Sequence, residues 1–163
     1  MKKVEGQKTV VVVLDNIRSV LNVGSIFRTS DAAAGVYKIY LCGCTPTPVD
    51  RFNRPRKDLA KTALGAEKTI PWEHQEKTVD IIKKLRKEGY QIISVELAEN
   101  SVDYKKVKVG NKVAFVMGNE VDGVDKKVLK LSDVVAEIPM LGEKESLNVG
   151  VSFGIAIFRM LNI

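Results

Sequence analysis

Residues 9–14, with the sequence TVVVVL, form an uninterrupted run of β-branched and apolar side chains. A run without polar alternation is typical of a strand buried on both faces of a parallel sheet. Residues 22–34 then place Val23, Ile26 and Phe27 on one helical face, and Gly35 can end that helix. Residues 36–42 (VYKIYLC) again favour a strand. The start of the chain therefore predicts a strand–helix–strand unit.

The same alternation continues along the chain. Residues 43–57 contain three prolines and predict a long loop. Further strands are expected at residues 90–97, 112–117 and 133–138, and helices at 78–87, 125–131 and 147–161. The last helix is almost entirely apolar, which predicts burial on most of its sides. We therefore expect one α/β domain over residues 1–163, with a mainly parallel sheet flanked by helices.

The composition suits a globular domain with a polyanionic partner. The chain has 45% apolar and 28% charged residues and a net charge of +6. Residues 1–112 hold 21 Lys and Arg against 13 Asp and Glu, whereas residues 113–163 hold 5 against 7. A basic body beside a slightly acidic segment points to nucleic acid. Solubility alone is the competing explanation of the charge.

The cysteine and histidine content argues against a metal centre. Cys42 and Cys44 are too close together to staple a fold, which favours a reducing compartment. His74 is the only histidine and is distant from them in sequence, so no zinc site is expected and His74 is assigned to an exposed loop. Residues 1–8 lack the apolar core of a signal peptide, and the apolar C-terminal stretch is shorter than a bilayer span. We expect a cytoplasmic protein without a membrane partner.

The first segment that can carry chemistry follows the first strand. Asn22 can cap the predicted helix, and Gly24 allows a backbone or a ligand to approach its first turn. Arg28 lies one turn beyond Gly24, and a helix start attracts anions. A capped helix with a solvated arginine explains the same residues.

Two later segments also combine turn residues with unexpected polar groups. Residues 117–124 (MGNEVDGV) follow a buried strand, where open α/β sheets bind ligands, although an ordinary loop fits too. In residues 138–154, Ser146 is suited to cap the last helix, and Asn148 is unusual on an apolar helix. Gly150 and Gly154 predict a close neighbour, either another segment or a second subunit. The chain contains neither a phosphate-binding loop motif nor a dinucleotide-binding motif.

Taken together, the three segments resemble the SpoU/TrmH family of S-adenosylmethionine-dependent RNA 2′-O-ribose methyltransferases, within the SPOUT superfamily. The motifs are N-x-G-x-x-x-R-T (residues 22–29), G-N-E-x-x-G (118–123) and I-P-M-x-G-x-x-x-S-L-N (138–148). The resemblance covers essentially the whole chain. One departure is Val121, where many members have glycine after the glutamate, and this could change the backbone angles of the loop.

The resemblance implies a SPOUT-type fold with a C-terminal trefoil knot around the cofactor, and a homodimer joined near the active site. Sequence rules alone do not predict a knot. The cofactor would be S-adenosylmethionine, and the residues expected to bind it are Leu97, Met117, Gly118, Ile138, Met140, Ser146 and Leu147. The catalytic residues would be Arg28, Asn22, Glu120, Ser146 and Asn148.

The implied reaction is the transfer of a methyl group to a ribose 2′-oxygen of tRNA or rRNA. A guanidinium group stays positively charged at neutral pH, so for Arg28 we favour phosphate binding and polarisation of the hydroxyl over a role as general base. RNA contacts are expected from Arg18, Arg28, Arg51, Arg54, Arg56, Lys57 and Lys61, with Phe52 able to stack on a base. The absence of an added RNA-binding domain favours a compact target such as tRNA. Two alternatives remain: a non-catalytic RNA-binding protein of the same fold, and an α/β enzyme that uses another nucleotide cofactor on small molecules.

Overall fold

The β-branched run near the start of the chain forms β1 (Thr9–Asp15), which lies inside a seven-stranded sheet. The computed structural model describes residues 8–33 and 35–163. The strand order is β3-β2-β1-β6-β4-β7-β5, and every strand pairing in the sheet is parallel. The parallel sheet predicted from the sequence is confirmed. The other strands are β2 (Val36–Cys42), β3 (Trp72–Gln75), β4 (Gln91–Val95), β5 (Val102–Asp103), β6 (Lys112–Gly118) and β7 (Val134–Glu137).

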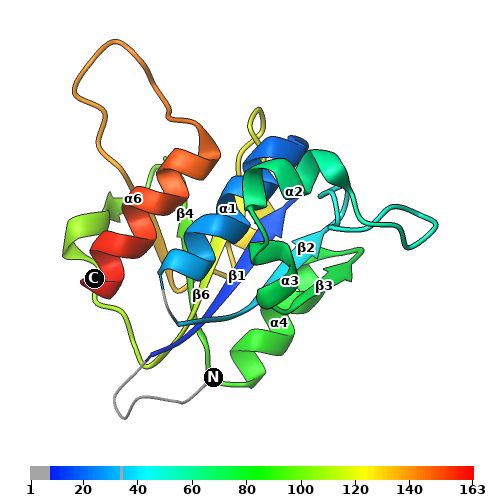
Figure 1. The fold of residues 1–163 in the computed structure, drawn as a ribbon. Coiled ribbons are helices and arrows are strands. Elements are labelled where there is room, and N and C mark those ends of the chain that lie inside the picture. The colour runs from blue at the N-terminus through cyan, green and yellow to red at the C-terminus, as the bar shows by residue number, and fades with distance from the viewer. Residues whose placement is uncertain (1–7, 34) are drawn as a thin grey trace.

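Helices cover both faces of the sheet (Figure 1). Val10, Val12 and Leu14 of β1 belong to the core beneath one set of helices, which comprises α1 (Val20–Ala32), α2 (Lys57–Ala63), α3 (Ala66–Thr69) and α6 (Val149–Leu161). Val11 and Val13 face the opposite core, beneath α4 (Thr78–Lys87) and α5 (Lys126–Leu129). Successive side chains of a strand point to opposite faces, so this run is apolar throughout because both of its faces are covered. A short 3-10 helix, η1 (Tyr104–Lys106), precedes β6.

The loops after the strands gather at one edge of the sheet. All strands run in the same direction, so their carboxyl ends lie together. In Figure 1 the turn after β6 (yellow) lies between two longer loops, the one after β2 (cyan) and the one before α6 (orange). The three segments selected in the sequence supply two of these loops and the start of α1.

The predicted helix boundaries need two corrections. Helix α1 begins at Val20 with Ser19 as its N-cap, so Asn22 lies in the first turn and is not the cap. Helix α6 begins at Val149, and its cap is Asn148 and not Ser146. In both cases two polar residues close in sequence can serve as caps, and the tertiary contacts described below decide between them. The predicted end of the first helix, Ala34, and the expected absence of a signal peptide in residues 1–7 lie outside the described residues.

The segment between β2 and α4 contains structure that the sequence did not predict. Helices α2 and α3 and strand β3 fill residues 57–75, where only the end of a loop was expected. These elements are four to seven residues long, which is too short for a clear period. His74 is exposed, but it belongs to the edge strand β3 and not to a loop, and its Nε2 lies 2.9 Å from the carbonyl oxygen of Gly43.

The last helix is exposed along one stripe. Its buried side chains, such as Phe153 and Ile157, contact the sheet core, while Val151 and Phe158 are exposed in this single chain. Ten of its thirteen residues are buried or half-buried, so the prediction of burial on most sides holds except along this stripe. Within the described residues, no helix is long and apolar enough to span a membrane.

Candidate active site

The carboxylate of Glu120 links the turn after β6 to the start of α1. Its Oε2 accepts a hydrogen bond from the backbone N–H of Arg18 at 3.1 Å. Its Oε1 accepts from the backbone N–H of Ser19 at 3.1 Å and from the side-chain amide of Asn22 at 2.8 Å. Partial burial tends to raise the pKa of Glu120, but these hydrogen bonds outweigh it and hold the pKa below its ordinary value. Glu120 is therefore a carboxylate at neutral pH and a weak base.

Asn22 extends this connection to the last helix. The side-chain amide of Asn148 donates to Oδ1 of Asn22 at 3.0 Å, so Asn22 bridges Asn148 and Glu120. The other end of the Asn148 side chain caps α6, because its Oδ1 accepts from the N–H groups of Gly150 at 2.9 Å and Val151 at 3.3 Å. Three of the five predicted catalytic residues thus form one hydrogen-bonded chain across three separate segments. Ser146 lies two residues before Asn148 in the sequence and lines the adjacent hollow.

A hollow of about 590 Å³ opens beside Asn148 and Glu120. Its walls come from the ends of β4, β6 and β7 and from the loop before α6. All seven residues predicted to bind the cofactor line it, namely Leu97, Met117, Gly118, Ile138, Met140, Ser146 and Leu147. The structure adds residues that the sequence did not single out, including Glu96, Asn119, Glu145, Val149 and Ser152.

Close backbone packing shapes the turn at residues 118–124. A Cβ atom on Gly118 would lie 2.1 Å from the carbonyl carbon of Gly123, so only glycine fits there. Glu96 supports the turn, since its Oε2 accepts from the N–H of Val124 at 2.9 Å. Val121 is not among the non-glycine residues with a positive φ, and its N–H donates to Oδ1 of Asn119 at 2.8 Å. Valine in place of the family's glycine is accommodated without strain in this turn.

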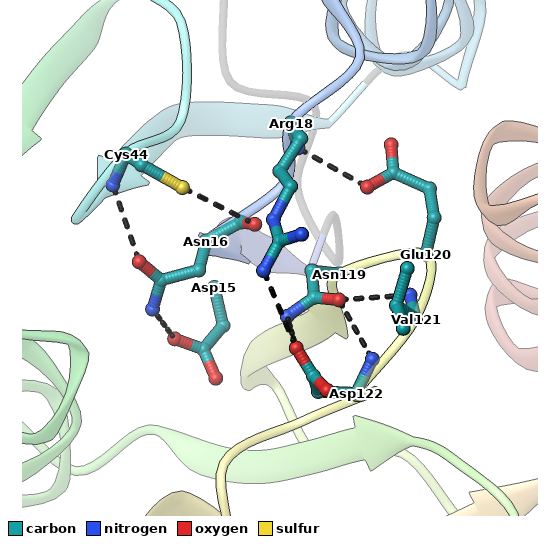
Figure 2. Close-up of polar contacts among 8 residues, drawn as sticks. All are labelled: Asp15, Asn16, Arg18, Cys44, Asn119, Glu120, Val121 and Asp122. Atoms are coloured by element: carbon teal, nitrogen blue, oxygen red, sulfur yellow. Dashed lines mark hydrogen bonds and ion pairs between the residues drawn. The ribbon is translucent and has the colours of Figure 1, made fainter.

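The two arginines of the first segment lie in different surroundings. Arg18 stands beside the 118–124 turn, and its Nη2 lies 3.4 Å from Oδ2 of Asp122 (Figure 2). Arg28 is exposed and about 9 Å further along the helix axis than Asn22. Among the described residues, Arg28 has neither a side-chain hydrogen-bond partner nor an ion-pair partner. Within one protomer, therefore, no hydrogen bond or ion pair of the described residues joins Arg28 to the hydrogen-bonded series Glu120–Asn22–Asn148.

Gly24 serves the packing of helices and not the approach of a ligand. A Cβ atom at this position would lie 2.7 Å from the carbonyl oxygen of Leu59 and 2.1 Å from Oγ1 of Thr62. Gly150 packs near Ser25, since a Cβ atom on Gly150 would lie 3.5 Å from Oγ of that serine. The close neighbour predicted for Gly150 is therefore α1 of the same chain.

Five of the seven predicted RNA-binding residues lie in the loop after β2 and in α2, and two of the arginines among them are paired. Arg54 forms an ion pair with Asp50 at 2.8 Å, and Arg56 forms one with Asp58 at 2.7 Å. Arg51, Lys57 and Lys61 are exposed and have no ion-pair partner in the described part of the chain. In this part of the chain, the positive charge available to a ligand is concentrated on these three side chains.

The sequence did not reveal that Asp15 organises the floor of this edge. Asp15 is only 2% exposed, and its carboxylate accepts from Oγ1 of Thr78 at 2.5 Å and from the N–H of Asp125 at 2.9 Å. It thereby connects β1, α4 and the segment after the 118–124 turn. An aspartate that ends an otherwise apolar strand was the available signal. Burial raises the pKa of the neighbouring Cys42 thiol to about 12, so this cysteine is no nucleophile.

Residues 9–158 match the model of the SpoU rRNA Methylase family. The chain belongs to the SpoU rRNA methylase family. The match spans all three segments of the site, so the resemblance recognised in the sequence is confirmed. The family's trefoil knot and the roles of the individual residues remain predictions.

Two relatives and one solved structure illustrate the similarity. The chain is 28% identical over 153 residues to a tRNA (guanosine(18)-2′-O)-methyltransferase of Aquifex aeolicus, covering 94% of this chain and 69% of the relative. It is 31% identical over 147 residues to the 23S rRNA (guanosine-2′-O-)-methyltransferase RlmB of Neisseria meningitidis, covering 90% and 56%. The crystal structure of an AdoMet-bound rRNA methyltransferase from Sinorhizobium meliloti superimposes with a TM-score of 0.85 and 31% identity, covering 96% of this chain and 57% of that one. The chain thus spans between about half and two thirds of these SpoU-family proteins.

Proposed function

We propose that this protein transfers a methyl group from S-adenosylmethionine to a ribose 2′-hydroxyl of RNA. The observation that carries the proposal is the hydrogen-bonded chain Glu120–Asn22–Asn148 at the edge of the hollow lined by the predicted cofactor residues. The similar proteins named above, one acting on tRNA and one on rRNA, support the reaction class. An enzyme with such substrates acts in the cytoplasm, where these RNAs are found.

The hollow suits S-adenosylmethionine in size and in chemistry. Its volume of about 590 Å³ lies within the range of small-molecule sites. Met117, Ile138 and Leu147 offer apolar walls for an adenine ring. Glu96, Glu120 and Glu145 border the hollow and favour a cationic ligand. The cofactor, when bound, would supply a methyl group on a positively charged sulfonium.

The protein's contribution would be to hold the ribose oxygen in line with that methyl group. Glu120 is unsuited to take the ribose proton, because its carboxylate already accepts three hydrogen bonds and its pKa is lowered. Its role is to fix the start of α1 against the turn after β6. Arg28 would bind a phosphate of the substrate and polarise the hydroxyl, and the proton would pass to water.

A homodimer would complete the site. Leu21 and Arg28 are seven residues apart and share one exposed stripe of α1. Val151 and Phe158 form a similar apolar stripe on α6, which lies beside α1 (Figure 1). Pairing of these stripes between two copies would cover apolar surface and bring Arg28 to the junction of the subunits.

The test is transfer of labelled methyl groups from S-adenosylmethionine to total RNA, followed by mapping of alkali-resistant linkages. We expect label in RNA at positions that resist alkaline cleavage, because a 2′-O-methyl group blocks the attacking hydroxyl. Label confined to bases would refute the ribose assignment. RNA binding without any transfer would instead support the non-catalytic alternative.

A further inference from the structure

The loop after β2, residues 43–56, holds a large aromatic side chain out in solvent. Phe52 is 61% exposed, and the guanidinium carbons of Arg51 and Arg54 lie 4.8 Å and 4.9 Å from the centre of its ring. An exposed phenyl ring accompanied by two guanidinium groups presents planar π surface and positive charge together. This combination is the one that proteins use to hold single-stranded nucleic acid.

The tip of this loop is ordered by its own hydrogen bonds. Oδ1 of Asp50 accepts from the N–H groups of Phe52 at 2.8 Å and Arg54 at 3.0 Å, and Oδ2 accepts from Nε of Arg54 at 2.9 Å. The N–H of Asn53, a residue with a φ of +59°, donates to the carbonyl oxygen of Asp50 at 2.9 Å. The backbone that carries Phe52 is therefore ordered by contacts within the loop, which lowers the entropic cost of binding a ligand there.

Beside the tip lies a shallow hollow of about 680 Å³. It is lined by Thr45, Thr47, Arg56 and His74 as well as by the tip itself. Arg54 and Arg56 are held by Asp50 and Asp58, so they shape the hollow, whereas Arg51 has no carboxylate partner in the described residues. The hollow is large enough for a nucleotide, and Arg51 can meet its phosphate.

The root of the loop is attached to the segment that receives Glu120. The N–H of Cys44 donates to Oδ1 of Asn16 at 3.2 Å, and Asn16 lies two residues before Arg18, whose N–H donates to Glu120. Figure 2 shows Cys44, Asn16, Arg18 and Glu120 in this order from one side of the site to the other. In Figure 1 the loop extends on the side of the 118–124 turn opposite to the loop before α6. A ligand at Phe52 would thus approach the site from the side away from the cofactor hollow.

We infer that the Phe52 tip and its hollow form a subsite for an unpaired nucleotide that flanks the methylated one. The base stacks on Phe52 and its phosphate pairs with Arg51. The inference rests on the proposed function, because it assigns the ligand to the substrate RNA. It narrows the substrate to a loop or a single-stranded end, since bases in an A-form helix are stacked on each other and their faces are closed to a protein ring.

Binding of short RNAs tests the subsite without requiring catalysis. We expect the intact protein to bind a single-stranded RNA oligonucleotide more tightly than the duplex of the same sequence, measured by fluorescence anisotropy at fixed salt. Phe52→Ala should weaken single-strand binding about 5- to 150-fold, the range of one base–aromatic stack, and leave duplex binding unchanged. Tyr37→Ala is the matched control, because Tyr37 is 62% exposed but lies at the opposite end of β2. Equal single-strand affinities of the intact protein and Phe52→Ala would overturn the inference.

A second variant reports stacking directly. Phe52→Trp keeps an aromatic ring at the tip, so it should restore single-strand affinity, and its indole emission should be quenched when a base stacks on it. Trp72 is the only natural tryptophan, and titration of the unmodified protein gives its contribution. Emission unchanged by saturating single-stranded RNA would contradict the stacked geometry even if the affinity is high.

The outcome for this subsite is separable from the outcome for the proposed function. If the intact protein methylates ribose and Phe52→Ala does so with an unchanged KM for RNA, the subsite is refuted and the function stands. If the intact protein transfers no methyl group but Phe52→Ala still loses single-strand binding, the catalytic proposal fails and the RNA subsite stands.

Discussion

At the scale of one residue, the position of Glu120 beside the start of α1 determines the pKa of its carboxyl group. Its carboxylate accepts two backbone N–H groups near the start of α1 and one side-chain amide, and its pKa is lowered as a result. A group whose pKa is lower in the folded protein binds fewer protons there than in the unfolded chain. Its contribution to stability is therefore present above the ordinary carboxyl pKa and lost as the pH falls through the folded value.

Replacing Glu120 by glutamine should reveal how the stability of the protein depends on pH. Glu120→Gln keeps the shape but removes the charge, so we expect a lower free energy of unfolding than that of the unmodified protein at pH 7. The difference should shrink as the pH falls below about 4.3, where the unfolded carboxyl becomes protonated. Urea unfolding of both proteins at pH 7, 5 and 3.5 measures it. A difference that stays constant over this range would show that the charge of Glu120 is not what stabilises the fold.

Arg28 is expected to matter for activity and not for stability. Arg28→Lys keeps the positive charge but cannot form two parallel hydrogen bonds to a phosphate. We expect a loss of about 10- to 100-fold in kcat/KM for RNA, as for one charge-assisted hydrogen bond, with unchanged urea unfolding. Arg28→Gln serves as the reference for complete loss of charge. Nearly full activity of Arg28→Lys would rule out the bidentate phosphate contact.

At the scale of elements, the sequence predicts best where a segment's environment is uniform. The β1 run is β-branched because both faces of the strand are covered, and α4 separates Ile82 and Leu85 from its lysines, so both elements could be located from the sequence. The N-caps of α1 and α6 could not be located from the sequence. Ser19 and Asn22 are equally suitable as the cap of α1 by local chemistry, and so are Ser146 and Asn148 as the cap of α6. The choice depends on the contact of Ser19 with Glu120 and on that of Asn22 with Asn148, which join residues 101 and 126 positions apart.

Two glycines in helices allow a comparison of crowded and open packing. A Cβ atom at Gly24 would meet the Leu59 carbonyl oxygen at 2.7 Å, whereas at Gly154 the nearest atom is Cγ2 of Thr29 at 3.8 Å. We expect Gly24→Ala to destabilise the protein by about 1–3 kcal/mol through the displacement of α2. Gly154→Ala should stabilise the chain by up to about 1 kcal/mol, because alanine favours the helix and fits the space. Urea unfolding of both variants tests the pair, and equal effects of the two changes would contradict the packing argument.

At the scale of the whole molecule, the site is formed by loops that the parallel sheet brings to one edge. The alternation of strands and helices predicts this edge, and the three motifs indicate which loops matter. Their mutual contacts are a property of the strand order, in which β6 lies between β1 and β4. That order could not be read from the periodicity of the segments, since sequence patterns identify strands but not their neighbours. Recognition of the family motifs supplied what the periodicity could not.

The exposed apolar stripes of α1 and α6 make a testable prediction about assembly. Leu21 is 56% exposed, Val151 51% and Phe158 37%, and they lie on adjacent helices. The double change Val151→Glu and Phe158→Glu places like charges on this surface, so it should convert a dimer into monomers in sedimentation equilibrium while the circular dichroism spectrum stays unchanged. Tyr37→Glu, at the start of β2, should remain dimeric. If Arg28 acts at the subunit junction, the monomeric variant should also lose methyl transfer. If the unmodified protein were a monomer, Arg28 would instead have to act within one chain. It would then have to act from a position about 9 Å further along the axis of α1 than Asn22.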